Sequence, residues 1–361
     1  MRERLRFLDT QLLLPMLLLV IMGTLTVYSA GRGTTQSSLW LKQTLWTVLG
    51  FLALAGVAAL SPLRIFRSAF PLYILGLLSL AAVLVAGHRI GGAQRWLVIG
   101  HMTLQPSELM KWLTLLFVAH RLGTRPLALV GGWDLVGAST LVFFPMLLVL
   151  KQPDLGMAIS FLPILVLIPL LKGLRARWVA IGLVGLSLFG YVAWHSVLKP
   201  YQKQRVLTFL DPGADLQGKG YQINQSRIAI GAGGLFGQGF TSGSQTQLNF
   251  LPVKTTDFVF SVWAEERGFL GVLLALGLFG AVISRILDTA RVAKSAAETY
   301  FCVGAAGIIA LHLFVNVGMV IGVLPNKGIV LPFFSAGGSS TLSYFLGLGV
   351  VMAVRYRAKV K

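Results

Sequence analysis

The chain has 361 residues, of which 55% are hydrophobic and only 12% are charged, and its mean hydropathy is +0.77. Soluble proteins carry about 25% charged residues, so the composition excludes a chain made of soluble domains. The formal net charge of +19 could indicate nucleic acid binding. The Lys and Arg residues instead collect in short segments between apolar stretches, which is typical of a membrane protein and argues against a nucleic acid partner.

Apolar stretches long enough to cross a bilayer recur along the chain. A helix needs about 20 mostly apolar residues to cross the hydrocarbon. We therefore expect an all-α integral membrane protein, a polytopic bundle of about ten transmembrane helices that forms a single membrane domain over residues 1–361. The helices are predicted near residues 11–30, 40–60, 69–87, 106–119, 133–150, 157–172, 178–197, 258–284, 299–321 and 340–354.

The basic residues indicate how these helices are oriented. The positive-inside rule places both termini in the cytoplasm and the chain in the cytoplasmic (inner) membrane, because the short outer segments hold only scattered cations. The first helix lacks a small-x-small cleavage site and is longer than the core of a signal peptide, so we expect it to be retained. The predicted inner segments are each basic, near residues 2–6, 64–67, 121–125, 172–177, 285–294 and 355–361.

Residues 198–257 are predicted to form a large extracytoplasmic loop between the seventh and eighth helices. A loop of this length is usually functional or disordered. Apolar anchors such as Tyr221, Ile223 and Phe236, together with several glycines, favour an ordered loop that lies against the outer face of the membrane. A mobile tether is the alternative.

Charged side chains close to the hydrocarbon are costly, and here they gather at the outer ends of the predicted helices. Lys111 follows Glu108 by three positions in the fourth helix, a spacing that predicts an ion pair on one helix face. Asp154 stands just before the sixth helix and could cap that helix or bond Lys111. Each of these motifs taken alone is also an ordinary capping signal.

The fourth, sixth, eighth and tenth helices are all predicted to begin at the outer side. Their free amide groups and positive dipole ends would point outward, which favours an anion. Asp257 stands directly before the eighth helix, where water meets the bundle, and is either a catalytic carboxylate or the N-cap of that helix. The sequence does not show a second carboxylate paired with it for acid and base catalysis.

The sequence shows no metal site. The one cysteine, Cys302, lies in an apolar helix, so neither an internal disulfide nor a cysteine metal site is expected. The five His residues have no metal-ligand spacing.

A series of short motifs runs along nearly the whole chain. They are GAQRWL at 92–97, QPSE at 105–108 with Lys111, QPDLG at 152–156, QSRIAIG at 225–231, FLP at 250–252, TDF at 256–258, EERG at 265–268, NVGM at 316–319, and LPFFS at 331–335 running into GGSS at 337–340. Together they resemble the SEDS family (shape, elongation, division and sporulation proteins) of bacterial cell-wall polymerases. The loop at 239–248 is more similar to the elongation branch, RodA, than to the division branch, FtsW. The family usually has Glu, a variable residue and His where this chain has Val253, Lys254 and Thr255.

The resemblance implies a peptidoglycan glycosyltransferase that polymerises lipid II at the outer face of the membrane during cell elongation. It also implies a class B penicillin-binding protein as the crosslinking partner, alongside other proteins of the elongation machinery. The catalytic carboxylate of the family carries over onto Asp257 as general base. Substrate contacts are expected from Lys111, Glu108, Asp154, Arg95, Arg205, Arg227, Ser339 and Ser340.

No cofactor is implied, although a divalent cation, Mg²⁺ or Mn²⁺, could bridge the phosphates of the substrate. A lipid II flippase or transporter is the alternative function, in which charged residues would line a path through the whole bundle. A non-catalytic scaffold that recruits the crosslinking enzyme is a third interpretation, and it would leave the outer carboxylates unexplained.

Overall fold

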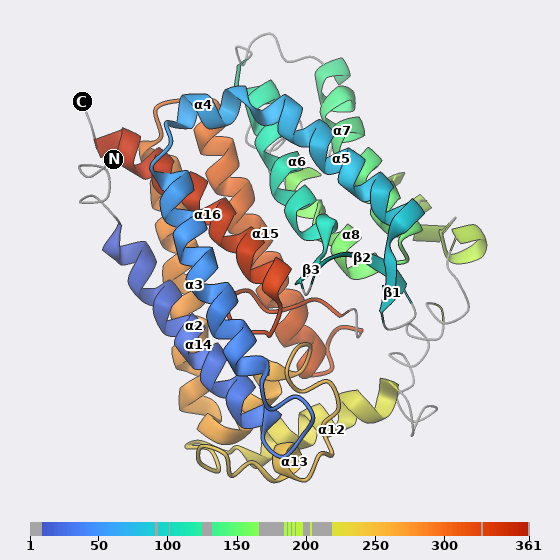
Figure 1. The fold of residues 1–361 in the computed structure, drawn as a ribbon, viewed down its shortest axis with the longest axis vertical. Helices are drawn as coiled ribbons and strands as arrows, with labels where there is room; N and C mark the ends of the chain where they lie inside the picture. Colours follow the sequence, from blue (N-terminus) through green and yellow to red (C-terminus); the bar gives the residue numbers. More distant parts are fainter. Residues whose placement is uncertain are drawn as a thin grey trace.

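The chain folds into a bundle of long helices, seen in a computed structural model (Figure 1). The structure describes residues 9–90, 93–100, 102–124, 132–165, 219–325 and 328–359, with short pieces between 184 and 203. The predicted seventh helix, the end of the sixth and Arg205 fall largely or wholly outside these residues, so the count of ten helices stays a prediction. The long helices are α2 (Thr10–Gly31), α3 (Leu39–Ala58), α5 (Ala69–Ala86), α6 (Pro106–Gly123), α7 (Gly132–Lys151), α14 (Val259–Val292), α15 (Ala296–Val320) and α16 (Gly338–Lys359).

Shorter elements connect the long helices or cover one end of the bundle. They are α4 (Pro62–Arg67), α8 (Leu155–Ile159), α12 (Lys219–Ala232), α13 (Ser244–Gln247) and the π-helix η2 (Ala193–Val197). Both described ends of the chain lie near α4, at the end of the bundle opposite α12 and α13 (Figure 1).

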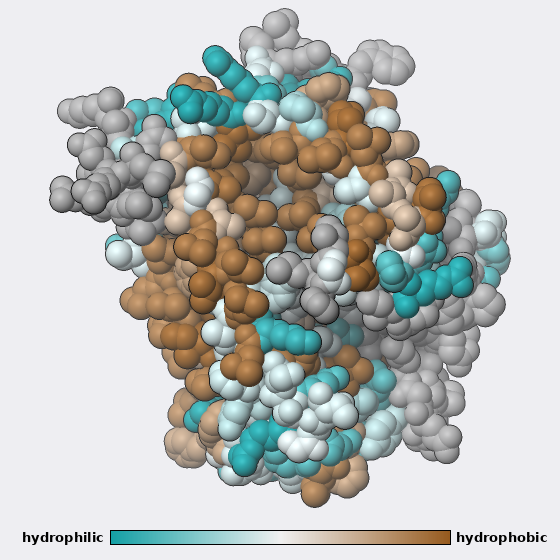
Figure 2. All heavy atoms as spheres, viewed as in Figure 1, coloured by the Kyte–Doolittle hydropathy of each residue, from teal (hydrophilic) through white to brown (hydrophobic). Residues whose placement is uncertain are grey.

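The surface of the bundle is that of a membrane protein. Among the described residues, α2, α3, α5, α14 and α15 are long and apolar enough to cross a bilayer. Large apolar side chains such as Leu52 (65% exposed) and Leu75 (61%) point away from the core. Figure 2 shows such hydrophobic residues over the middle of one face, with hydrophilic residues toward the two ends. The prediction of an all-α, multi-pass membrane protein is confirmed.

A small antiparallel sheet joins α5 to α6, and it was not predicted. Its strands are β1 (His88–Ile90), β2 (Ala93–Ile99) and β3 (Met102–Leu104), in the order β1-β2-β3. β1 and β3 are too short, at three residues each, to show an alternation of apolar and polar residues, and β2 ends in four consecutive apolar residues. The sequence therefore did not reveal the sheet. The sheet carries Arg95 on its central strand toward the start of α6.

The helix α14 breaks at Gly268, and the preceding loop fills the break. Gly268 has φ +65° and ψ −165°, a conformation that only glycine adopts readily. The amides of Phe269 and Leu270 therefore bond to the loop, donating to Gly234 O (2.9 Å) and Leu235 O (3.2 Å). The kink exposes no unpaired amide at these two positions, because the loop supplies the acceptors that a regular helix would have supplied.

Two buried carboxylates near the start of α14 anchor the same loop. Glu265 accepts hydrogen bonds from Gln245 N (2.7 Å), Thr246 N (3.2 Å) and Thr246 Oγ1 (2.6 Å). Glu266 accepts from Thr241 N (3.2 Å) and from the hydroxyl of Ser29 in α2. Residues 241–246 are thus held against α14 largely through bonds from their backbone amides, and the side chain of Gln247 reaches α2 by donating to Ser29 O (3.3 Å).

The opposite end of the bundle is closed by ion pairs. Asp9, just before α2, bonds Arg285 of α14 through both of its oxygens, at 2.7 and 2.9 Å. Glu298 at the start of α15 bonds Arg357 of α16. These pairs tie the ends of four long helices together on the side where the two termini lie.

Candidate active site

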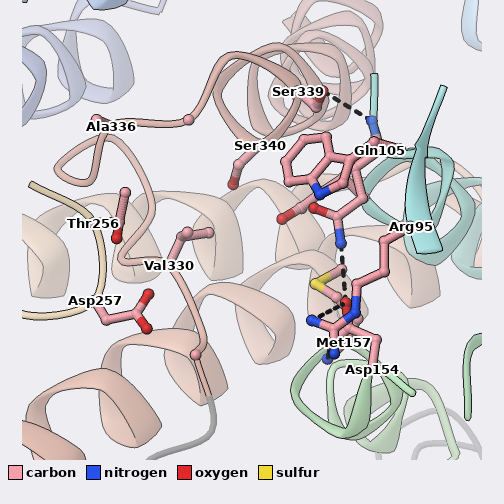
Figure 3. A pocket seen from close by; sticks show the side chains of 14 residues that line it. Arg95, Gln105, Asp154, Met157, Thr256, Asp257, Val330, Ala336, Ser339 and Ser340 are labelled. Atoms are coloured by element: carbon pink, nitrogen blue, oxygen red, sulfur yellow. Dashed lines mark hydrogen bonds and ion pairs between the residues drawn. The ribbon is translucent and has the colours of Figure 1, made fainter. Parts of the chain in front are cut away.

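A cavity of about 240 Å³ opens between the sheet, the starts of several helices and the segment that follows α15 (Figure 3). It is lined by Arg95, Trp96, Gln105, Glu108, Asp154, Met157, Thr256, Asp257, Gly328, Val330, Ala336, Gly337, Ser339 and Ser340. Lining residues precede or begin α6, α8, α14 and α16, so four helices start at this cavity, as predicted. Their amide ends make it attractive to an anion.

Asp257 lies on the side of the cavity opposite Arg95 and Asp154 (Figure 3). It belongs to a non-helical segment, and the N-cap position of α14 is Phe258, without a side-chain capping bond. The alternative interpretation of Asp257 as that cap is therefore not supported. Gly328 has φ +64°, a backbone conformation that favours glycine, and lies beside the carboxylate: a Cβ there would be in ordinary contact with Asp257 Oδ2, at 3.5 Å.

Asp154 and Arg95 form the opposite wall. Asp154 caps α8 by accepting from Met157 N (3.1 Å), as predicted, and also accepts from Gln105 Nε2 (3.0 Å). Arg95 Nη1 lies 3.3 Å from Asp154 Oδ2, while Arg95 Nε donates to Gln152 O (3.2 Å) and Nη2 donates to the carbonyl of Pro153. The guanidinium is thus held on the turn before α8, with its side chain 27% exposed.

Glu108 and Lys111 form the predicted ion pair, with 2.6 Å between Lys111 Nζ and Glu108 Oε2. Glu108 lines the cavity, whereas Lys111 lies behind it, fully buried. Lys111 Nζ also donates to Tyr344 OH (3.3 Å) and lies 4.4 Å from the centre of that ring. Lys111 is therefore not among the side chains that line the cavity.

The two serines at the start of α16 differ in their contacts. The hydroxyl of Ser339 accepts from Gln105 N (3.0 Å) and donates to Thr103 O (3.0 Å), which ties α16 to the start of α6. Ser340 Oγ points toward the cavity (Figure 3). Ser339 therefore builds the wall, and Ser340 offers a hydroxyl to what the cavity binds.

Of the two remaining predicted contacts, only Arg227 lies in the described part of the chain. Arg227 is exposed on α12 and is not among the lining residues. Arg205 lies outside the described residues. Conversely, the lining includes Gln105 and Thr256, which stand beside predicted site residues, and Met157 and Val330, whose residue types carry no signal of a site.

The part of the chain that the structure describes contains no group of three His, Cys, Asp or Glu side chains that could hold a metal ion. Asp154 and Asp257 lie on different walls (Figure 3).

Comparison with known proteins identifies the family. The model of a family described as cell cycle protein, named for FtsW, RodA and SpoVE, matches residues 4–360. The peptidoglycan glycosyltransferase MrdB of Escherichia coli K12 is 37% identical over 354 residues, which cover 98% of this chain and 95% of MrdB. The probable peptidoglycan glycosyltransferase FtsW of Coxiella burnetii is 34% identical, with 97% of each chain covered.

Solved structures agree with this assignment. A chain of a peptidoglycan synthase complex that coordinates polymerization and crosslinking is 36% identical, with a TM-score of 0.85 and coverage of 98% of this chain and 99% of that one. The rod shape determining protein RodA of Thermus thermophilus is 33% identical, with a TM-score of 0.73 and 98% of each chain covered. This chain belongs to the FtsW/RodA/SpoVE family of cell cycle proteins.

Proposed function

We propose that the chain is a peptidoglycan glycosyltransferase that polymerises lipid II into glycan strands during cell elongation. The observation that carries the proposal is the carboxylate of Asp257, which lines a cavity where four helices begin, opposite a fixed arginine. An anionic substrate suits the helix ends, and a carboxylate suits proton removal. The names of the relatives supply the reaction class.

In the proposed reaction, the 4-hydroxyl of GlcNAc in one lipid II attacks the anomeric carbon of MurNAc in another. The new glycosidic bond forms as the bond to pyrophosphate breaks, and Asp257 accepts the proton of the hydroxyl. Pyrophosphate is a good leaving group, so orientation of the two sugars and one base would suffice. Direct displacement would convert an α-linked donor to a β-linked product.

The pyrophosphate would lie at the starts of α6 and α16, with Arg95 and Ser340 as contacts. The described lining carries three carboxylates, Glu108, Asp154 and Asp257. Arg95 is paired with Asp154 and the buried Lys111 with Glu108, so these two described cations leave an excess of negative charge. A divalent cation on the phosphates, Mg²⁺ or Mn²⁺, would offset this imbalance. We expect a chelator to lower the polymerisation rate and either cation to restore it, whereas an unchanged rate would exclude the cation.

The proposed location is the cytoplasmic membrane, with both termini in the cytoplasm and the cavity on the extracytoplasmic side. The basic segments at the termini support this orientation. The proposed partner is a class B penicillin-binding protein, supported by the likeness to a chain of a complex that coordinates polymerization and crosslinking. Membership of the elongation machinery rests on the loop at 239–248.

A lipid II flippase is the alternative. A transporter needs a polar path through the whole bundle that opens at each side in turn. In the described residues, the Asp9–Arg285 and Glu298–Arg357 pairs join the helix ends opposite α12, which a transporter closed on that side would also show. The names of the relatives favour the transferase.

The test is polymerisation of purified lipid II by the reconstituted chain with its cognate class B partner. We compare wild type with Asp257→Asn and Asp257→Ala, and use Asp288→Asn, an exposed carboxylate at the other end of the bundle, as the matched control. Loss of the base should slow polymerisation by about 100- to 10,000-fold. Normal rates in both Asp257 variants would indicate that Glu108 or Asp154 is the general base instead. A wild type that transfers lipid II across liposomes without polymer would support the flippase.

A further inference from the structure

The segment that carries Asp257 has no regular secondary structure of its own. Residues 252–258 are a series of turns between the loop and α14. The position of the carboxylate therefore depends on what holds this backbone, and the described contacts show what does so.

Three consecutive carbonyls of the segment accept hydrogen bonds from residues that follow in the sequence. Thr255 O accepts from Ala336 N (3.0 Å). Thr256 O accepts from Ser335 Oγ (2.7 Å), and Asp257 O accepts from Asn316 Nδ2 (3.1 Å). Ser335 Oγ in turn accepts from Leu331 N (2.9 Å), which fixes the hydroxyl that reaches Thr256.

Asn316 connects two neighbouring segments of the cavity lining through one nitrogen atom. It is fully buried in α15, and Nδ2 donates both to Asp257 O and to Ile329 O (2.8 Å). Ile329 lies between Gly328 and Val330, which line the cavity beside Asp257. One side-chain amide thus sets the spacing between the Asp257 segment and the 328–330 segment next to it.

The burial of Asn316 has an energetic cost. Two carbonyls can only accept, so the amide must turn its NH₂ group toward them. Oδ1 is then buried without a hydrogen-bond partner among the described residues, and such a group is normally unfavourable. The two hydrogen bonds that Nδ2 donates offset this cost.

His312 lies one turn earlier on the same face of α15 and extends the connection. Its Nδ1 lies 3.3 Å from Val330 O, which places the proton on Nδ1, and its Nε2 then accepts from Ser160 Oγ (2.8 Å) at the end of α8. The face of α15 that carries His312 and Asn316 therefore contacts the Asp257 segment, the 328–330 wall and α8.

We propose that Asn316 is a positioning residue for the reaction, which holds the backbone of Asp257 against the 328–330 segment and so fixes where the carboxylate lies in the cavity. Ser335 acts in the same way at the neighbouring carbonyl. The inference rests on the proposed function, in which Asp257 is the general base.

The test uses Asn316→Leu, which keeps the size of the side chain and removes its donors, and Ser335→Ala as a second, milder variant. Tyr73→Phe is the matched control, because Tyr73 OH also donates to a backbone carbonyl of another helix, Leu141 O (2.8 Å), but lies outside the cavity. Each protein is compared in lipid II polymerisation with its partner and in hydrogen exchange of residues 253–258.

We expect kcat of Asn316→Leu to fall on the order of 10- to 100-fold, with KM within about twofold of wild type, because a misplaced base slows chemistry more than binding. Ser335→Ala should show a smaller fall. Exchange of residues 253–258 should be about 10-fold faster in Asn316→Leu. Tyr73→Phe should change neither kcat nor this exchange.

Wild-type kcat in both Asn316→Leu and Ser335→Ala would overturn the inference, and so would an equal loss of kcat in Tyr73→Phe, which would indicate a general loss of stability. If Asn316→Leu does not fold, the kcat of Ser335→Ala decides whether the inference holds. If wild type makes no polymer, the proposed function fails, and the exchange comparison alone decides whether Asn316 holds the segment.

Discussion

Lys111 and Glu108 form an ion pair with 2.6 Å between Nζ and Oε2, and both side chains are buried inside the helix bundle. The same spacing of three residues recurs in Asp288 and Arg291, whose ion pair at 3.1 Å is exposed to 45% and 80%. The two pairs share local geometry and differ in burial, so each serves as the control for the other.

We predict that Lys111→Met destabilises the fold by about 3–5 kcal/mol, because it leaves the Glu108 carboxylate buried without its counter-ion. Adding Glu108→Gln should recover part of the loss. Arg291→Met should leave stability nearly unchanged, since exposed pairs contribute little. The stability of all three variants is measured by unfolding with SDS in detergent micelles. Equal losses for Lys111→Met and Arg291→Met would contradict the prediction.

We predict that Gly268→Ala destabilises α14. The backbone conformation of Gly268 costs a non-glycine residue about 1–3 kcal/mol, and a Cβ would lie 2.3 Å from Gly237 N. The loop at 233–239 should then detach, visible as faster hydrogen exchange there. Gly277 lies in the same helix with nothing within 4 Å of its Cβ position, so Gly277→Ala should be neutral or slightly stabilising. A stable Gly268→Ala variant would mean that the kink is not required.

We predict graded effects at Asp154. Asp154→Ala removes the cap of α8 and the carboxylate beside Arg95. It should lower the free energy of unfolding by at least about 2 kcal/mol, because a helix cap contributes about 1 kcal/mol and a hydrogen bond to a charged group contributes more. Asp154→Asn keeps a capping oxygen and should cost less. Thermal unfolding in detergent distinguishes the two, and identical losses would show that the cap contributes nothing.

We predict that the stability of the protein depends on pH through Lys254. Its Nζ donates to Thr246 O (2.6 Å) and Asn249 Oδ1 (2.7 Å), and burial lowers its pKa below the ordinary value of 10.5. Just below pH 10.5 the unfolded chain therefore binds more protons than the folded chain, so this residue makes stability rise with pH in that window.

Lys254→Met should reduce the slope of stability against pH between the lowered pKa and 10.5, whereas Lys42→Met, at an exposed position of α3, should keep it. Denaturation midpoints collected across this range give the slope. An unchanged slope in Lys254→Met would assign the dependence to other groups.

The positions of most described helices could be predicted from the sequence, because the thickness of a bilayer sets the length of each apolar stretch. The helix predicted at 11–30 is Thr10–Gly31, and the one predicted at 299–321 is Ala296–Val320. The helix predicted to end at 284 continues to Val292, since backbone hydrogen bonds can extend a helix beyond the hydrocarbon, where its side chains need not be apolar.

The sequence by itself determined the contacts between residues that lie within one helix or at its start, because helix geometry fixes them. Glu108 and Lys111 had to be neighbours if that stretch was helical, and Asp154 was placed to cap the helix that follows it. The tertiary structure alone decided which distant residues meet: Arg95 on Asp154, and Asn316 on the backbone of Asp257. Such contacts depend on how helices far apart in the chain pack together, and local periodicity contains no information about that packing.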